Sequence, residues 1–281
     1  MGESPCAVTF SGVLAGLRAA IRSVRTTDLL QLSAFVLVAA GGCIGLLRGA
    51  EGLGYNWQWH RLQRYLVQWT TDGISFGPLL QGLRITLEIV AVSLVVSLLI
   101  GVCVALMRLS RSHMAAGMAR IYLELIRNTP LLIQIFVVYF VFAPIFDMGR
   151  FTAAVLALSL FEGAYASEIV RAGILALPRG QWEASASLGM NHRQTYRYVI
   201  LPQALRNMLP PLTSQGISLV KDSALVSTIA IYDLTMRGQQ IIAETFLTFE
   251  VWFAVAAIYL AVTLLLTLLV KYLEYRLFSR T

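Results

Sequence analysis

Long runs of apolar residues, separated by short polar stretches, constrain this chain more than any other feature of its sequence. The first run, residues 29–47, has 19 residues and no charge, and a helix of that length just crosses a hydrocarbon core of about 30 Å. Only 13% of all residues are charged, against roughly a quarter in soluble domains. We therefore predict an all-α membrane protein with about six transmembrane helices, whose apolar runs are residues 29–47, 85–107, 131–146, 151–177, 209–232 and 251–270.

The basic residues predict the orientation of these helices. With the N-terminus inside, the cytoplasmic segments hold thirteen Lys and Arg residues and the external segments hold six. Because cytoplasmic loops are enriched in Lys and Arg, both termini are expected in the cytoplasm. The net charge of +7 is thus explained by basic cytoplasmic loops and does not indicate binding to nucleic acid. If residues 29–47 were peripheral instead, five spans would remain and the N-terminus would lie outside.

The external segment after the first run combines aromatic and basic residues. It suggests an interfacial helix lying among lipid headgroups, and the alternative is an aromatic belt without a ligand. The residues concerned are Trp57, Trp59, Arg61, Arg64, Tyr65 and Trp69.

Small residues recur at every fourth position of the second run, namely Ser93, Ser97, Gly101 and Ala105. Such a stripe lets another helix backbone approach closely. It predicts tight packing either inside one bundle or across a dimer.

Several kinds of chemistry have no motif in this chain. The two lysines, Lys221 and Lys271, do not follow a phosphate-binding GxxxxGK[ST] loop, and HExxH does not occur. The three cysteines lie far apart in the sequence, without metal-site spacing. The chain is therefore expected to be neither an ATPase nor another enzyme, and to hold no cofactor or metal of its own.

The cytoplasmic loop of residues 178–206 reads as an ordered structure. Residues 181–188 suit a helix, and Gly189 suits the position just after its end. Asn191 and Gln194 have the spacing of a capping box that opens a second short helix, which Pro202 should limit. A helix, a glycine break and a second helix make this loop a candidate docking element.

The same loop resembles the EAA signature of ABC importer permeases. Glu183-Ala184-Ser185, Gly189 and Leu201-Pro202 have its spacing, although Ser185 replaces the usual second alanine and Val199 the usual isoleucine. Residues 123–130, 161–173 and 210–223 are similar to the polar amino acid branch, which includes histidine, arginine, glutamine and glutamate/aspartate importers. The resemblance covers residues 78–275.

This resemblance implies a type I importer permease domain of five helices at residues 78–275. Residues 1–77 would add an N-terminal cytoplasmic segment, an extra helix and the external segment, and residues 276–281 a cytoplasmic tail. Two permease subunits, identical or different, would pair in the bacterial inner membrane. ATPase subunits that bind ATP and Mg would dock on their EAA loops. A periplasmic or tethered binding protein would deliver a polar amino acid. Within this branch, the sequence favours the glutamate/aspartate or general amino acid importers. The coupling residues would be Trp182, Glu183, Ala184, Ser185, Ala186 and Gly189, with Trp182 and Ala186 in the groove of the ATPase.

Charges inside the spans should face the protein interior and be paired. Glu124 with Arg127, and Glu168 with Arg171, are three residues apart, which is the spacing of structural ion pairs on one helix face.

Glu162 has no basic residue within four positions and is a substrate-path candidate. It could bind the ammonium group of an amino acid while Lys221, next to Asp222, binds the carboxylate. Thr213, Ser214, Gln215 and Ser223 would then form a polar wall. In the competing interpretation, Glu162 pairs with Lys221 directly and neither residue touches substrate. The intramembrane carboxylates also leave open an ion-coupled secondary transporter that works without ATP.

Overall fold

The computed structural model describes residues 26–52, 54–70 and 73–278, and it divides the chain into two compact units, Met1–Trp57 and Gln58–Thr281. In the first unit the described element is α2 (Thr26–Gly52), which contains the first apolar run. Large side chains along it, including Phe35 and Leu37, are exposed. The predicted positions of both chain ends concern residues 1–25 and 279–281, which lie outside the described part.

In the second unit, three described helices are long and apolar enough to cross a membrane. They are α4 (Pro78–Leu109), α8 (Arg150–Leu175) and α13 (Thr248–Phe278). A fourth crossing is possible if α5 (His113–Arg127) and the segment Leu131–Ile145 count as one span with a bend of 105°. The helical membrane architecture is confirmed, and the number of six spans stays a prediction.

The bend after α5 follows from its sequence. Asn128 ends the helix, and the ring of Pro130 carries no N–H to continue it. The next segment consists of α6 (Leu131–Phe136), the π-helical η2 (Val137–Phe142) and α7 (Ala143–Ile145). Gln134 of α6 donates from Nε2 to the carbonyl oxygens of Ile126 at 2.7 Å and Thr129 at 2.9 Å. It thus caps carbonyl groups at the C-terminal end of α5 and holds the next segment to them.

The stripe of small residues on α4 packs against α8 within this chain. Ser93, Ser97 and Ala105 are buried, and the hydroxyl of Ser159 on α8 donates to the carbonyl oxygen of Ser93 at 3.3 Å. A Cβ atom built on Gly101 would lie 2.7 Å from the Cβ of Ala166. The prediction of tight packing is confirmed, and the partner is a helix of the same bundle.

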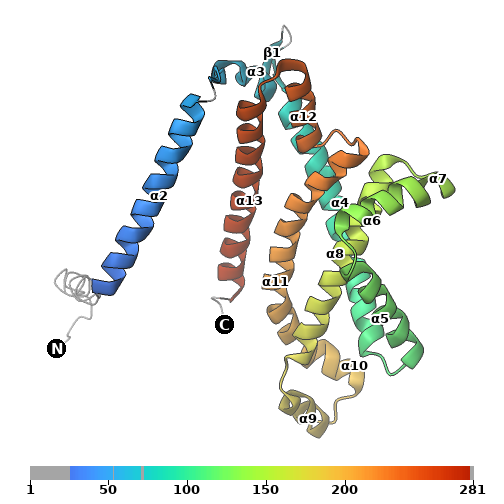
Figure 1. The fold of residues 1–281 in the computed structure, drawn as a ribbon. Coiled ribbons are helices and arrows are strands. Elements are labelled where there is room, and N and C mark those ends of the chain that lie inside the picture. Colours follow the sequence, from blue (N-terminus) through green and yellow to red (C-terminus); the bar gives the residue numbers. More distant parts are fainter. Residues whose placement is uncertain (1–25, 53, 71–72, 279–281) are drawn as a thin grey trace. The chain divides into compact units, whose positions relative to one another are not determined.

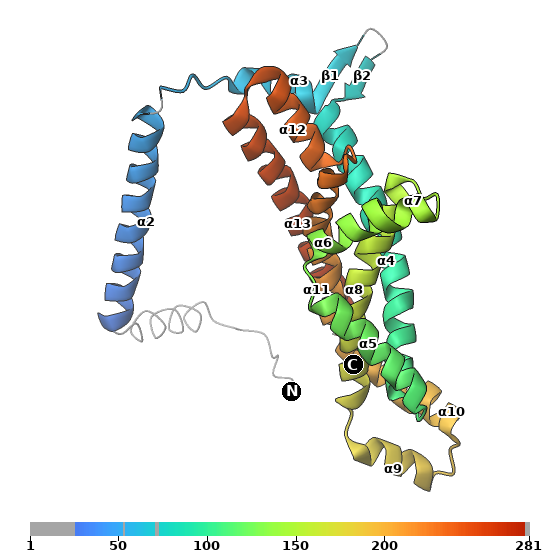
Figure 2. The same ribbon diagram turned by 45° about the vertical axis from the view of Figure 1, so that its right-hand side comes forward.

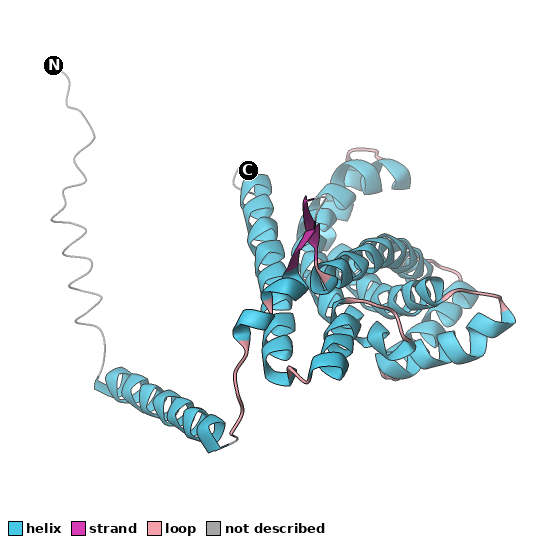
Figure 3. Ribbon diagram, turned by 90° about the horizontal axis from the view of Figure 1, so that it is seen from above, coloured by secondary structure: helices cyan, strands magenta, loops and turns pink. Residues whose placement is uncertain are grey.

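At one end of this unit, called here the hairpin end, the chain forms short elements (Figures 1 and 2). They are η1 (Trp59–Arg61), α3 (Gln63–Leu66), β1 (Val67–Thr70) and β2 (Gly73–Phe76), followed later in the chain by α12 (Leu234–Thr245). The strands are antiparallel, with Val67 opposite Phe76, and they form the magenta pair in Figure 3.

The interfacial helix expected through Trp69 is therefore wrong in part, because Trp69 lies in a strand. Val67, Ile74 and Phe76 are residues that favour strands, and Gly73 has a φ of +121°, which β-branched and aromatic residues avoid. The segment is also tied to the last helix, since the backbone N–H of Gln58 donates to Oε1 of Glu250 at 2.7 Å.

The opposite end of the unit, called here the loop end, carries α9 (Arg179–Ser187) and α10 (His192–Gln194). From α10 the chain continues through η3 (Thr195–Ile200) into α11 (Leu201–Asp222), followed by the 3₁₀ helix η4 (Ser223–Ile229). The loop end is visible at the bottom of both Figure 1 and Figure 2.

Candidate coupling loop and substrate path

The first helix of the loop ends in a glycine cap. Gly189 has a φ of +71°, a conformation that is costly for residues with a Cβ atom. Its N–H donates to the carbonyl oxygen of Ala186 at 2.9 Å, and the N–H of Met190 donates to Ser185 at 3.1 Å. These two bonds are the Schellman pattern, so the predicted helix and glycine break are confirmed.

The second helix opens with the predicted capping box. Asn191 Oδ1 accepts from the N–H of Gln194 at 3.0 Å, and Gln194 Oε1 accepts from the N–H of Asn191 at 2.9 Å. The expected limit at Pro202 is wrong, because helical structure continues from His192 to Asp222. The π-helical turn of η3 directly before Pro202 widens the backbone, which accommodates a residue that lacks an N–H and would crowd the preceding turn.

The coupling candidates divide into exposed and buried residues. Glu183, Ala184 and Ala186 are exposed on α9. Ser185 is buried, and its hydroxyl donates to the carbonyl oxygen of Trp182 at 2.9 Å. A small residue is therefore needed at this position, and serine meets the need where alanine is usual.

Trp182 packs inside the loop. Its ring meets Tyr196 edge-on with 5.1 Å between ring centroids, and it lies against the buried cluster that includes Ile200 and Ala204. The expected place of Trp182 in the groove of an ATPase stays a prediction. The half-buried indole fastens α9 to η3 and α11, so that the loop is held to the following helix.

One of the two predicted intramembrane ion pairs belongs to a larger cluster. Glu168 of α8 bonds Arg171 through Nη2 at 3.0 Å, as expected. Its other carboxylate oxygen contacts Arg108 at the end of α4 and lies 3.5 Å from Nη1 of Arg127 at the end of α5. One carboxylate thus joins the ends of α4 and α5 to α8.

The expected pair of Glu124 and Arg127 is wrong. The carboxylate of Glu124 accepts a hydrogen bond from Nδ2 of Asn128 at 2.9 Å, while Arg127 reaches across to Glu168. The guanidinium also lies over the ring of Tyr165, with 5.9 Å to its centroid. The carboxylate of Glu124 is already bonded to Asn128 on its own helix, and Arg127 extends to the carboxylate of Glu168 instead.

The carboxylate of Glu162 is hydrogen-bonded to a side-chain amide and not to a basic residue. It is 2% exposed, and its Oε2 accepts a hydrogen bond from Nε2 of Gln215 on α11 at 2.7 Å. Its Oε1 is shielded from solvent and has no hydrogen-bond partner among the described residues. Asp222 lies near enough to interact with Glu162 electrostatically. Lys221 is exposed and makes no salt bridge within the described part of the chain, so the direct pair with Glu162 is wrong.

The hydroxyl groups of the remaining candidates bond to backbone carbonyl groups nearby in the sequence. The hydroxyl of Thr213 donates to the carbonyl oxygen of Pro210 at 2.8 Å and also lies 3.4 Å from Oε1 of Glu274 on α13, and the hydroxyl of Ser223 donates to Val220 at 2.8 Å. Ser223 is fully buried. Of the predicted wall, Gln215 is the residue that contacts Glu162.

Sequence reasoning missed Arg108 as a partner of Glu168. The two residues are 60 positions apart and lie on different helices, and no local spacing links them. The sequence does contain three arginines near the ends of apolar runs, which indicates that they need an acidic partner. It does not show which helix ends lie next to each other.

The chain matches the family model "Binding-protein-dependent transport system inner membrane component" over residues 97–279. It is 40% identical over 211 residues to the glutamine transport system permease protein GlnP of Escherichia coli K12, covering 74% of this chain and 96% of the relative. It is 39% identical over 215 residues to the L-cystine transport system permease protein TcyB of Bacillus subtilis, covering 75% and 92%.

Among solved structures, a crystal structure of an amino acid ABC transporter with histidines has 40% identity and a TM-score of 0.67, covering 71% of this chain and 94% of that chain. The inward-facing MetNI methionine ABC transporter, at 22% identity and a TM-score of 0.60, shares the fold. Together with the cap, the capping box and the EAA spacing, these likenesses agree with the resemblance seen in the sequence. The chain belongs to the family of inner membrane components of binding-protein-dependent transport systems.

Proposed function

We propose that this permease imports polar L-amino acids across the bacterial cytoplasmic membrane, driven by ATP hydrolysis in separate subunits. The relatives are named for glutamine, L-cystine and arginine transport, and the related crystal structure is an amino acid transporter. In this proposal the permease domain comprises residues 78–275, and residues 1–77 form an additional N-terminal region.

The observation that carries this proposal is the ordered loop of α9 and α10. Its Schellman cap, capping box and internal tryptophan hold Glu183, Ala184 and Ala186 exposed at one end of the bundle. A rigid projection can transmit a push from an ATPase subunit, whereas a flexible loop would absorb it. Because the described residues contain one such loop, two permease chains would be needed to engage two ATPases.

The proposed substrate path passes Glu162 and Gln215. The unpartnered Oε1 of Glu162 could accept the ammonium group of an amino acid, and the nearby Asp222 adds negative charge. The exposed ammonium of Lys221 is a candidate for the substrate carboxylate in the assembled dimer. An interior carboxylate without a basic partner is costly, which supports a role beyond packing.

The test is uptake of labelled amino acids by vesicles containing the reconstituted complex. Uptake should require ATP and binding protein, and Glu162→Gln should abolish uptake while the ATPase subunits still copurify. Ser159→Ala, which lies one turn away on the same helix, is the matched control and should transport normally. Uptake without ATP but with an ion gradient would favour the alternative of a secondary transporter, and unchanged uptake by Glu162→Gln would remove this residue from the path.

A further inference from the structure

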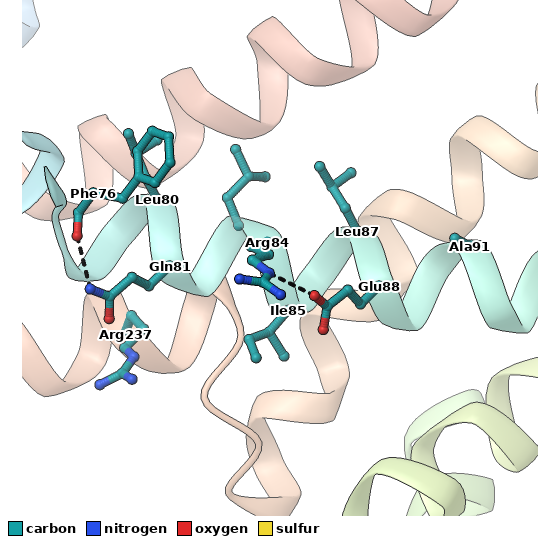
Figure 4. A pocket seen from close by; sticks show the side chains of 10 residues that line it. Phe76, Leu80, Gln81, Arg84, Ile85, Leu87, Glu88, Ala91 and Arg237 are labelled. Atoms are coloured by element: carbon teal, nitrogen blue, oxygen red, sulfur yellow. Dashed lines mark hydrogen bonds and ion pairs between the residues drawn. The ribbon is translucent and has the colours of Figure 1, made fainter.

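A cavity of about 840 Å³ lies along the outer face of α4 at the hairpin end (Figure 4). Its polar lining consists of Gln81, Arg84 and Glu88 of α4 and Arg237 of α12. The rest of the lining is apolar and includes Leu80, Leu87 and Ala91. The proposed substrate path and coupling loop use none of these residues.

If α4 is centred in the bilayer, its length puts Gln81 and Arg84 of this cavity at the level of lipid headgroups. The helix has 32 residues, which span about 48 Å at 1.5 Å per residue. The hydrocarbon core is about 30 Å thick, so about six residues project at each end if the helix is centred. Arg84, the seventh residue of α4, then lies at the boundary, and Leu87, Glu88 and Ala91 lie one to two turns deeper.

The charges in the cavity leave one guanidinium unmatched. Arg84 and Glu88 neutralise each other through a salt bridge of 2.7 Å. Arg237 donates from Nη1 to Oε1 of Gln240 at 3.1 Å and lies over the ring of Tyr232, but it makes no salt bridge within the described residues. Its Nε is shielded and has no hydrogen-bond partner there. The polar lining therefore carries a net positive charge beside an apolar surface that runs toward the membrane interior.

We propose that this cavity binds a phospholipid, with the phosphate at Arg237 and an acyl chain along Leu80, Leu87 and Ala91. A guanidinium is well suited to a phosphate because it offers several N–H donors in one plane. Only a ligand with both an anionic head and an apolar tail matches both parts of the lining. A free amino acid would leave the apolar part uncovered.

The test is native mass spectrometry of the delipidated, assembled transporter with added phosphatidylglycerol or with diacylglycerol, which lacks the phosphate. Phosphatidylglycerol should bind at least tenfold more tightly than diacylglycerol, and Arg237→Gln should remove that difference. Arg150→Gln is the control, because it removes one positive charge outside the cavity. Equal binding by the two variants would overturn the proposal.

A second variant tests the acyl-chain surface without changing the charge. Ala91→Trp should fill the deeper part of the cavity and reduce binding of phosphatidylglycerol at least tenfold. Normal lipid binding by this variant would contradict the proposed position. Displacement of phosphatidylglycerol by free L-glutamine, or loss of the lipid site when two permease subunits pair, would assign the cavity to substrate or to the subunit interface instead.

Discussion

Gly101 of α4 faces Ala166 of α8 so closely that a Cβ atom at position 101 would lie 2.7 Å from the Cβ of Ala166. The backbone nitrogen of Ser167 would be 3.1 Å away. Neither atom is the flexible end of a long side chain, so the helices themselves must separate to admit a larger residue. This contact sets the distance between the two helices that carry the charged cluster and the substrate-path candidate.

Gly101→Val should therefore destabilise the protein. Overpacking of this kind costs about 1–3 kcal/mol, and the melting temperature of the purified transporter should fall. Gly117→Ala on α5 is the control, because nothing lies within 4 Å of its Cβ position, and it should gain about 0.5–1 kcal/mol from the better helix former. Equal melting temperatures for the two variants would contradict the close approach.

Glu168→Gln should loosen the joint between α4, α5 and α8. Glutamine keeps a hydrogen-bond acceptor but leaves three guanidinium groups near each other without a counter-charge. A loss of about 2 kcal/mol is expected for charged hydrogen bonds, measured as a lower midpoint of thermal unfolding. Glu244→Gln on α12, outside this cluster, should leave the midpoint nearly unchanged.

A double variant separates charge repulsion from other effects. Adding Arg127→Gln to Glu168→Gln removes one of the three positive charges and should restore part of the lost stability. If the double variant is less stable than the single one by the full effect of Arg127→Gln alone, the two residues are independent and the cluster does not act as a unit.

Gly189→Ala should weaken coupling to the ATPase. The φ of +71° costs a residue with a Cβ atom about 1–2 kcal/mol, so the end of α9 should shift. Less ATPase subunit should copurify, and ATP-driven uptake should slow. Gly180→Ala, also with open space at its Cβ position but without a positive φ, is the control. Identical behaviour of both variants would show that the left-handed cap is not needed.

Asp233 should make stability depend on pH. Burial raises the pKa of its carboxyl group to about 6, although it accepts a hydrogen bond from the N–H of Met236. Because the folded state holds this proton more tightly than the unfolded state, this contribution favours folding at low pH. It is lost as the pH rises from about 4 to about 6.

Asp233→Asn preserves the helix cap and removes the ionisation. The variant should therefore melt above the parent protein at pH 8, and the difference should shrink at pH 5. Asp147→Asn, at an exposed position, should show no such change. A difference that is equal at both pH values would indicate that ionisation of Asp233 does not limit stability.

Local patterns in the sequence predicted local structure well. The spacing of Asn191 and Gln194 identified the capping box, Gly189 identified the end of α9, and the small residues of α4 identified a packing face. Each of these depends on residues within one or two helical turns. The hairpin was missed because its strands have four residues each. Alternation of apolar and polar residues over so short a stretch is a weak signal, and the spacing of the aromatic residues suggested a helix.

Contacts between helices could not be predicted in the same way. The bond between Glu162 and Gln215 spans 53 positions, and that between Arg108 and Glu168 spans 60. Which residues meet depends on how each helix is rotated about its axis, and the chain is too apolar overall for a polar face to fix that rotation. The charges implied that partners existed, but the identity of the partners required the fold.

The side chain of Gln134 has a consequence for how this protein can move. By bonding Ile126 and Thr129 across the bend of 105°, it braces the corner between α5 and the segment that follows. We therefore expect the two arms to turn together as one elbow-shaped body. Transport motions would then change the packing between this body and its neighbours, and the corner itself would keep its angle throughout the cycle.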